Sequence, residues 1–280
     1  MIIREDIAQT FPELFRTKKV NGREVDVKQL IVALTRELAP EIAKTLTARR
    51  ELLASSAPVR EKYAWPKWDD TFDDPVTGKP RTFHQIVQGM IDNFLGQDSQ
   101  WRWRLNYEVP IPKDAHPLTN PGLELTGPWH PLDMAFNALN SAAPINMPDF
   151  EDASPPHFQP DGTPKNQPIG VFAAMQNAKD ILEGHWADRP YEVVKKGQPR
   201  VYRIKKSPAE WPTRFARPPG MHLQYDHITV DGRPVPAMIP ITILWAVNTY
   251  DALTRAGTGV YYYIPKIQTP QEALILEKLL

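Results

Sequence analysis

Three carboxylates follow a short apolar segment in the middle of the chain. Residues 145–147 read Ile-Asn-Met and predict a brief strand, and Asp149, Glu151 and Asp152 come just after it. Side chains alternate along a strand, so Asp149 and Glu151 point to the same side if the extended backbone continues. Clustered carboxylates repel one another and need a cation, a proton or a basic partner. The spacing indicates a polar rim around a metal-bound substrate, although a loop of capping acids has the same pattern.

Two basic residues end the next two predicted strands. Arg217 follows residues 214–216 and precedes a rigid Pro-Pro-Gly turn, and Lys266 follows residues 260–264 and one proline. The carboxyl ends of parallel strands meet at one edge, where α/β folds carry their chemistry. The planar fork of an arginine suits an oxyanion there. Each residue alone is more often a solvated ion-pair partner, so the prediction of a site rests on their convergence.

Helical and extended segments alternate in the second half of the chain. Apolar spacing predicts helices at residues 132–141, 171–182, 241–255 and 270–280. Residues 191–194 and 200–204 flank a Lys-Lys-Gly-Gln-Pro segment, which predicts a hairpin. Strands separated by helices imply a parallel sheet. We therefore predict an α/β fold in which residues 121–280 form part of a (β/α)8 TIM barrel, about three βα units.

The first part of the chain reads as a helical and irregular layer. Apolar residues recur every four positions in residues 27–38 and predict a helix. Pro40 suits the first turn of a second helix, which runs to about residue 53. Another helix is predicted at residues 83–95. We assign residues 1–120 to an N-terminal helical and irregular domain.

Composition narrows the class of protein. The 280 residues carry 33 basic and 33 acidic side chains, which gives no support for a nucleic-acid or membrane partner. The chain has no cysteine, so disulfides and thiolate chemistry are excluded. The longest apolar run, residues 235–247, is too short to span a bilayer. Acidic residues near the N-terminus argue against a secretory signal, and a cytoplasmic location is expected.

Three other patterns have simpler explanations than chemistry. His222 and His227 have the spacing of a metal pair only in a helix, and a turn signal follows them, so structural histidines are favoured. Gly257 and Gly259 precede a strand, whereas nucleotide-binding glycines follow one. Residues 100–104, Gln-Trp-Arg-Trp-Arg, interleave aromatic and basic side chains as single-strand binders do. The neutral net charge favours packing of these tryptophans instead.

Several blocks, in order along the chain, carry a resemblance to a known family. They are TGP at 126–128, NALNS at 137–141, DFEDASP at 149–155, QNAKD at 176–180, ARPPGMHLQYDHITVDGRPVP at 216–236 and AGTGVYYYIPKIQTPQEA at 256–273. In these blocks the chain resembles the malate synthase family. The resemblance runs from about residue 26 to the end and is weak before residue 126. Ordered blocks are more specific than any single motif.

The resemblance implies an acyltransferase of the glyoxylate bypass and tricarboxylic acid cycle. Its substrates would be acetyl-CoA and glyoxylate, joined in a Claisen condensation and hydrolysed to malate, with Mg²⁺ holding the glyoxylate. It implies that Arg217 polarises the glyoxylate carbonyl and stabilises enolate charge. It also implies that Asp149, Glu151 and Asp152 lie beside the magnesium and touch its waters. The family commonly has Arg-x-Arg-Gly where this chain has Arg-Pro-Pro-Gly, so one basic residue is lost.

In malate synthases, the metal-binding Glu and Asp and the enolising Asp base come after the third strand. We therefore expect the N-terminal part of a longer or split enzyme, inactive alone and completed by a C-terminal chain. Mg²⁺ is expected for the complete enzyme, with no metal ligand assigned in this chain. Two alternatives stay open. One is a non-catalytic remnant or interaction protein that pairs through an open sheet edge. The other is a related acyl-CoA lyase.

Overall fold

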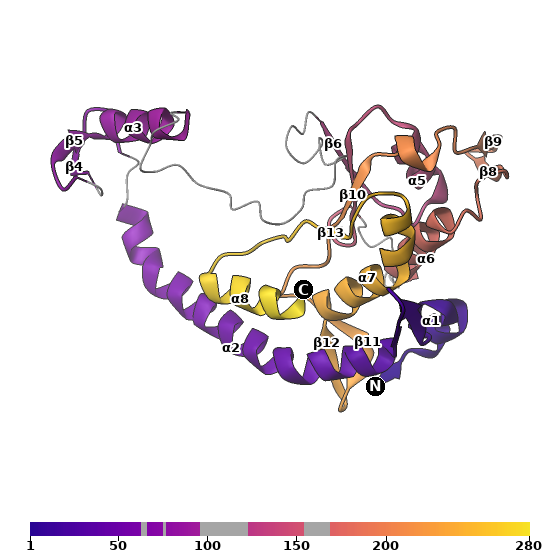
Figure 1. Cartoon of the computed structure of the whole chain (residues 1–280). Helices are drawn as coiled ribbons and strands as arrows, with labels where there is room; N and C mark the ends of the chain where they lie inside the picture. The colour runs from indigo at the N-terminus through magenta and orange to yellow at the C-terminus, as the bar shows by residue number, and fades with distance from the viewer. Residues whose placement is uncertain (63–65, 75–76, 96–122, 154–168) are drawn as a thin grey trace. The chain divides into compact units, whose positions relative to one another are not determined.

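The chain folds into two compact units in the computed structural model, which describes all residues except 63–65, 75–76, 96–122 and 154–168. Met1–Arg49 and Pro112–Leu280 form the larger unit, and Arg50–Ile111 form the smaller one. The aromatic and basic segment 100–104 and the predicted domain boundary at residue 120 lie outside the described residues, so both stay predictions. Figure 1 shows the elements of each unit.

A parallel sheet of four strands forms the centre of the larger unit. Its strands are β6 (Glu124–Gly127), β7 (Ile145–Pro148), β10 (Thr213–Ala216) and β13 (Tyr261–Tyr262), in the spatial order β13-β10-β7-β6. All three neighbouring pairs are parallel. Within this sheet, each strand therefore lies next to the sheet strand that precedes or follows it along the chain. This order is typical of (β/α) barrels and differs from doubly wound sheets, whose order reverses.

The sequence predicted three of these four strands. β7 and β10 are each one residue longer than predicted, and β13 is shorter than the predicted strand at 260–264. Three strands were predicted for this sheet, and β6 is a fourth strand that the sequence analysis missed. Its residues, Glu-Leu-Thr-Gly, include one β-branched and no aromatic side chain, and its extended form depends on pairing with β7. The mixed α/β class with a parallel sheet is confirmed, and no barrel closes within the described residues.

Helices separate the strands of the sheet along the chain. They are α5 (Leu132–Asn140), α6 (Ile169–Leu182) and α7 (Met238–Arg255), and α8 (Pro270–Leu279) follows β13. All four were predicted within a few residues of these bounds. Phe136, Met175 and Leu244 bury their side chains completely, so these helices contribute to one core. The hydroxyl of Tyr262 donates to the carbonyl of Thr242 at 2.7 Å and ties β13 to α7.

One continuous helix replaces the two helices predicted near the N-terminus. α2 (Val27–Lys62) passes through Pro40 without a break. Pro40 has no N–H and removes one helical hydrogen bond, which was the basis of the predicted boundary. However, Ile31, Leu38 and Ile42 are buried on both sides of it and form one apolar stripe. Packing of this stripe outweighs the local loss, because tertiary contacts supply most of the stability of a helix.

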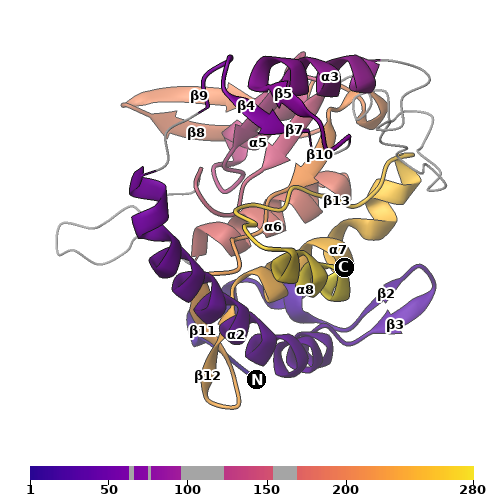
Figure 2. The same ribbon diagram turned by 90° about the vertical axis from the view of Figure 1, so that its left-hand side faces the viewer.

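Two elements lie along α2 in its part before residue 50. α8 is joined to it by the ion pairs Lys278–Glu41 and Arg49–Glu272, each 2.7 Å long. The hairpin of β11 (Gln224–Val230) and β12 (Arg233–Pro236) lies beside it in both views (Figures 1 and 2). Arg36 of α2 donates twice to Asp231 at the hairpin tip, at 2.8 Å. α2 therefore packs against two segments from the C-terminal part of the chain, the β11–β12 hairpin and α8.

Smaller elements complete the described chain. β1 (Ile2–Ile3) pairs with β11, and α1 (Glu5–Thr10) and the 3-10 turn η1 (Pro12–Phe15) precede the hairpin of β2 (Lys18–Val20) and β3 (Arg23–Val25). The predicted hairpin near residue 197 is confirmed as β8 (Tyr191–Lys195) and β9 (Gln198–Tyr202), and the 3-10 turn η2 (Pro208–Glu210) leads to β10. The smaller unit contains β4 (Thr71–Asp73), β5 (Pro80–Thr82) and the predicted helix α3 (Phe83–Leu95). None of the described helices is both long and apolar enough to cross a membrane.

Candidate functional site

The candidate site begins where β7 and β10 end side by side. Asp149 follows the last residue of β7, and Arg217 follows the last residue of β10. The two residues form a parallel bridge beyond the named strands. The N–H of Arg217 donates to the Pro148 carbonyl at 3.0 Å, and the N–H of Phe150 donates to the Arg217 carbonyl at 3.1 Å. The sheet therefore fixes the backbone of both residues before their side chains interact.

Asp149 and Arg217 form a two-point ion pair in a closed environment. Nε of Arg217 donates to Oδ1 of Asp149 at 2.8 Å, and Nη2 donates to Oδ2. The Asp149 side chain has no exposed surface, and that of Arg217 is 15% exposed. The hydrogen bond that Arg217 donates to Asp149 raises the pKa of Arg217 above its ordinary value, with burial opposing it and the charges of Asp149, Asp152 and Glu151 adding to it. The guanidinium is thus charged, and its plane is fixed.

The acidic turn after β7 is folded around the Asp149 carboxylate. The N–H of Glu151 donates to Oδ1 at 2.9 Å, and the N–H of Ala153 donates to Oδ2. These two backbone hydrogen bonds hold the turn against both oxygens of the carboxylate. Asp149 therefore organises its own loop as well as the arginine on the next strand.

Lys266 binds the other two carboxylates of the turn. Its ammonium contacts Glu151 Oε1 and lies 3.1 Å from Asp152 Oδ1, and Asp152 is also 3.4 Å from the Arg217 guanidinium. The hydrogen bond to Glu151 is the largest cause that raises the pKa of Lys266. The backbone of Lys266 has φ of +60°, an unfavourable region for a side chain with a Cβ, at a cost of about 1 kcal/mol. The ion pairs hold the ammonium over the turn.

All five residues predicted from the sequence come together at this edge of the sheet. They are Asp149, Glu151, Asp152, Arg217 and Lys266, and we call them the strand-end cluster. Sequence reasoning missed the backbone N–H of Gly220, which donates to Glu151 Oε2 at 3.0 Å. The Pro-Pro-Gly turn was the available signal, because it fixes where that N–H points. Their roles in catalysis stay predictions.

The strand-end cluster does not fit a magnesium ion as a direct ligand set. Magnesium takes near-octahedral oxygen ligands, usually one or two carboxylates with several waters. Here both oxygens of each carboxylate already contact an ammonium, a guanidinium or a backbone N–H. Three negative charges face two positive ones, and the arrangement is an ion-pair network. A metal in this region would need ligands other than these three carboxylates.

His222 and His227, which were considered as a metal pair, have different surroundings. His227 is buried on β11, with its ring 4.4 Å from the centre of the Tyr225 ring and 5.7 Å from that of Phe172. Burial lowers its pKa to about 4, although a hydrogen bond to Asp226 opposes the shift. His222 lines a cavity of about 620 Å³ between α2 and the β11–β12 hairpin. His227 therefore packs as a neutral aromatic ring in the core.

Comparison with known proteins points to one family. The family model "Malate synthase, TIM barrel domain" matches residues 213–280, which include β10, Arg217, β13 and Lys266. The glyoxysomal malate synthase of Glycine max is 33% identical over 156 residues, 55% of this chain and 24% of that protein. The chain is related to the malate synthase family. The resemblance seen in the sequence blocks is thereby confirmed.

Other relatives match over similar lengths. The malate synthase of Oryza sativa subsp. japonica is 33% identical over 171 residues, 60% of this chain and 26% of that protein. Malate synthase A of Escherichia coli (strain K12) is 28% identical over 193 residues, 67% of this chain and 31% of that protein. The chain therefore spans about a quarter to a third of the length of these relatives. The whole relative's activity does not follow from a match of this extent.

Proposed function

We propose that the chain contributes to a malate synthase-type reaction, in which acetyl-CoA and glyoxylate condense and the thioester is hydrolysed to malate. The observation that carries the proposal is the strand-end cluster, where Arg217 is held by Asp149 at the carboxyl ends of two parallel strands. The family relationship supports an enzyme of the acyltransferase class. Acetyl-CoA and glyoxylate as substrates, and the glyoxylate bypass as the setting, come from the same relationship.

Arg217 would act on the oxygen at which negative charge develops. A guanidinium has five N–H donors, and Asp149 takes two of them. The remaining donors can polarise the carbonyl of glyoxylate and stabilise the oxyanion that forms when the new carbon–carbon bond is made. A donor fixed in advance needs no reorganisation in the transition state, and one such donor typically contributes about 3 kcal/mol. Asp149 acts through Arg217 as a positioning residue.

Lys266 and the acidic turn would set the local charge around that arginine. Lys266 pairs with Glu151 and Asp152, so that the strand-end cluster carries three negative and two positive charges and a net charge of −1. Without Lys266 the turn would repel an anionic substrate such as glyoxylate. Magnesium, which the relationship implies for the reaction, does not fit these carboxylates as ligands, and the residues of this chain are proposed to bind and polarise the substrate.

Catalysis is proposed to need more of a barrel than the described residues contain. The described sheet has four parallel strands, whereas a closed (β/α) barrel has eight. A base that takes the methyl proton of acetyl-CoA has no candidate in the strand-end cluster, because each of its carboxylates is ion-paired. The further strands would come from the same polypeptide or from a complementing chain.

An assay of CoA release tests this proposal. The chain alone, and the chain fused to the C-terminal part of a malate synthase relative, are given acetyl-CoA, glyoxylate and Mg²⁺, and release of the CoA thiol is followed. We expect turnover by the fusion and none by the chain alone. Turnover by the chain alone on the order of 10 per second would contradict the need for further strands. A folded fusion without turnover would contradict the function.

A second candidate function is association through the sheet. Within the described residues, β13 and β6 are the outer strands of the parallel sheet, and Leu125 and Tyr263 are 39% and 47% exposed. Unpaired strand edges next to exposed apolar side chains are templates for pairing with another chain. Gel filtration separates the candidates. An inactive chain that forms a defined complex with a barrel half would support pairing, whereas a sharp monomer peak in that mixture would contradict it.

A further inference from the structure

A histidine and two carboxylates meet where α6 ends. Asp180 lies in the last turn of the helix, and Glu183 and His185 follow it. Gly184, at φ of +83°, reverses the chain. The N–H of His185 then donates to the Asp180 carbonyl at 2.9 Å, and the N–H of Gly184 donates to the Ile181 carbonyl at 3.0 Å. This pair of bonds is a Schellman cap, and it fixes the backbone that carries the three side chains.

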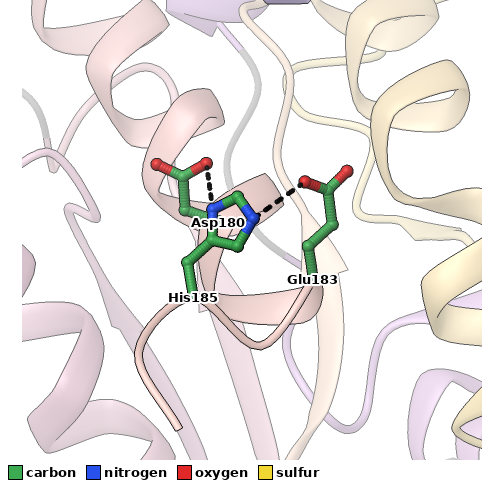
Figure 3. A group of neighbouring side chains, drawn as sticks. All are labelled: Asp180, Glu183 and His185. Atoms are coloured by element: carbon green, nitrogen blue, oxygen red, sulfur yellow. Dashed lines mark ion pairs between the residues drawn. The ribbon is translucent and has the colours of Figure 1, made fainter. Parts of the chain in front are cut away.

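The imidazole of His185 lies between the two carboxylates. Nδ1 is 3.3 Å from Oδ1 of Asp180, and Nε2 is 3.7 Å from Oε2 of Glu183 (Figure 3). A neutral imidazole has one N–H and can donate to only one of them. The other ring nitrogen then directs a lone pair at a carboxylate. Such a contact is repulsive unless a proton or a metal ion lies between the two atoms.

The longer contact has the length expected for two ligands of one metal ion. Zn–N bonds measure about 2.0–2.1 Å and Zn–O bonds about 2.0–2.2 Å. At tetrahedral or slightly wider angles, bonds of that length separate the two ligand atoms by about 3.4–3.7 Å. The Nε2–Oε2 separation of 3.7 Å fits this geometry and is long for a hydrogen bond. The shorter contact matches the carboxylate that orients a metal-binding histidine through its other nitrogen.

Local charge also favours a cation here. The two carboxylates lie at the C-terminal end of α6, where the helix dipole adds negative potential. Lys179 opposes this, because its ammonium lies 2.6 Å from the same Oε2 of Glu183. The side chains of Asp180, Glu183 and His185 are 26%, 35% and 55% exposed, so an ion can reach them from solvent. Lys179 would thus compete with a metal for Glu183.

We propose that these side chains bind a divalent first-row transition-metal ion such as Zn²⁺. His185 Nε2 and Glu183 are the ligands, Asp180 orients the imidazole through Nδ1, and water completes the coordination. An imidazole ligand favours zinc over magnesium or calcium. The site lies at a helix end outside the strand-end cluster, and it does not depend on the function proposed above.

Isothermal titration of the metal-free chain with zinc chloride at neutral pH tests this site. We expect His185→Gln to abolish measurable binding and Asp180→Asn to weaken it about 10–100-fold, as for other residues that orient a metal ligand. Lys179→Met should strengthen binding, because it removes the competing ammonium. A purely structural ion-pair cluster would not gain zinc affinity from that change. His84→Gln, a histidine of the smaller unit, is the matched control and should bind zinc like the parent.

Three outcomes would overturn the site. The first is a parent chain that does not bind zinc, and the second is a His185→Gln variant that binds zinc as the parent does. The third is equal competition by Mg²⁺, which would mean unspecific attraction to acidic side chains. Lys179 is buried, so the melting temperature of each variant is measured in parallel. If Lys179→Met does not fold, Glu183→Gln takes its place and should lose zinc binding, and unchanged affinity in Glu183→Gln would equally overturn the site.

Discussion

Arg214 and Arg217 lie three residues apart, one on β10 and one just after it. Their guanidinium groups have opposite surroundings. Arg217 is paired with Asp149 through two hydrogen bonds, and its pKa is raised. Arg214 is 3% exposed, and among the described residues its Nε and Nη1 have no hydrogen-bond partner. Its guanidinium lies 5.4 Å from the centre of the Trp211 ring, and burial lowers its pKa to about 10.

The difference shows what the C-terminal edge of the sheet provides. Arg217 occurs where a second strand ends in a carboxylate, so its charge is compensated and its orientation is fixed. Arg214 is within the strand, where its register partner is the neutral Asn146. A charge that is compensated but still partly accessible can act on a ligand, whereas an uncompensated buried charge only costs stability. The two arginines can therefore be separated by substitution.

The largest effect is expected from removing the partner of Arg217. Asp149→Leu leaves a largely buried guanidinium without its carboxylate and should lower the free energy of unfolding by about 3–5 kcal/mol. Denaturant unfolding followed by tryptophan fluorescence measures it. The double variant Asp149→Leu with Arg217→Met removes both charges and should recover much of that loss. Equal destabilisation of the single and double variants would mean that Asp149 contributes by packing alone.

The next effect concerns the rate of the completed enzyme, the fusion described above. Arg217→Lys keeps the charge and loses the planar fork, so it should lower kcat about a hundredfold, or about 3 kcal/mol. The loss should fall on kcat more than on KM, because the contact strengthens as charge develops. Arg36→Lys, which alters an exposed ion pair, is the matched control. A kcat of Arg217→Lys within twofold of the parent would return Arg217 to a structural role.

The sequence predicted the strand-end cluster because the position of each residue depends on the strand just before it. Asp149, Arg217 and Lys266 each follow an apolar strand, and strands of a parallel sheet end at one edge. The sequence did not predict which side chains and backbone groups of the cluster form hydrogen bonds with each other. The two-point contact of Arg217 depends on the register of β7 and β10, and the bond from Gly220 depends on a turn conformation. Neither is encoded in residue type or spacing.

The other differences have the same origin in long-range structure. α2 continues through Pro40 because of packing, and β6 is a strand because β7 lies beside it. The contacts of His185 required knowledge of the cap at Gly184, although a glycine after a helical segment was an available signal. Helices α5 to α8 were predicted because their apolar periodicity is complete within each segment. Local patterns therefore predicted elements, and tertiary contacts decided their limits and partners.

His227 offers an effect of similar size in a group whose charge, like that of Arg214, is disfavoured by burial. Its pKa is about 4 in the folded chain against an ordinary value near 6.5. Below pH 6.5 the unfolded chain binds a proton that the folded chain does not, so stability should fall as the pH falls from 6.5 to 4. The full loss is about 3 kcal/mol. Chemical denaturation at several pH values measures it, and His227→Phe should remove this part of the pH dependence. An equal slope in His227→Phe would assign it to other groups.

The smallest effect is expected at Arg214, and it sharpens the comparison most. Arg214→Met replaces a buried guanidinium by an apolar chain of similar length, so the free energy of unfolding should stay unchanged or rise by about 1 kcal/mol. Arg217→Met, the same substitution three residues on, strips Asp149 of its partner and should destabilise the chain instead. Denaturant unfolding of both variants under one condition measures the difference in sign. If Arg214→Met proved as damaging as Arg217→Met, the Arg214 guanidinium would have to gain more from the Trp211 ring than burial costs it, and the contrast between a compensated and an uncompensated arginine would fail.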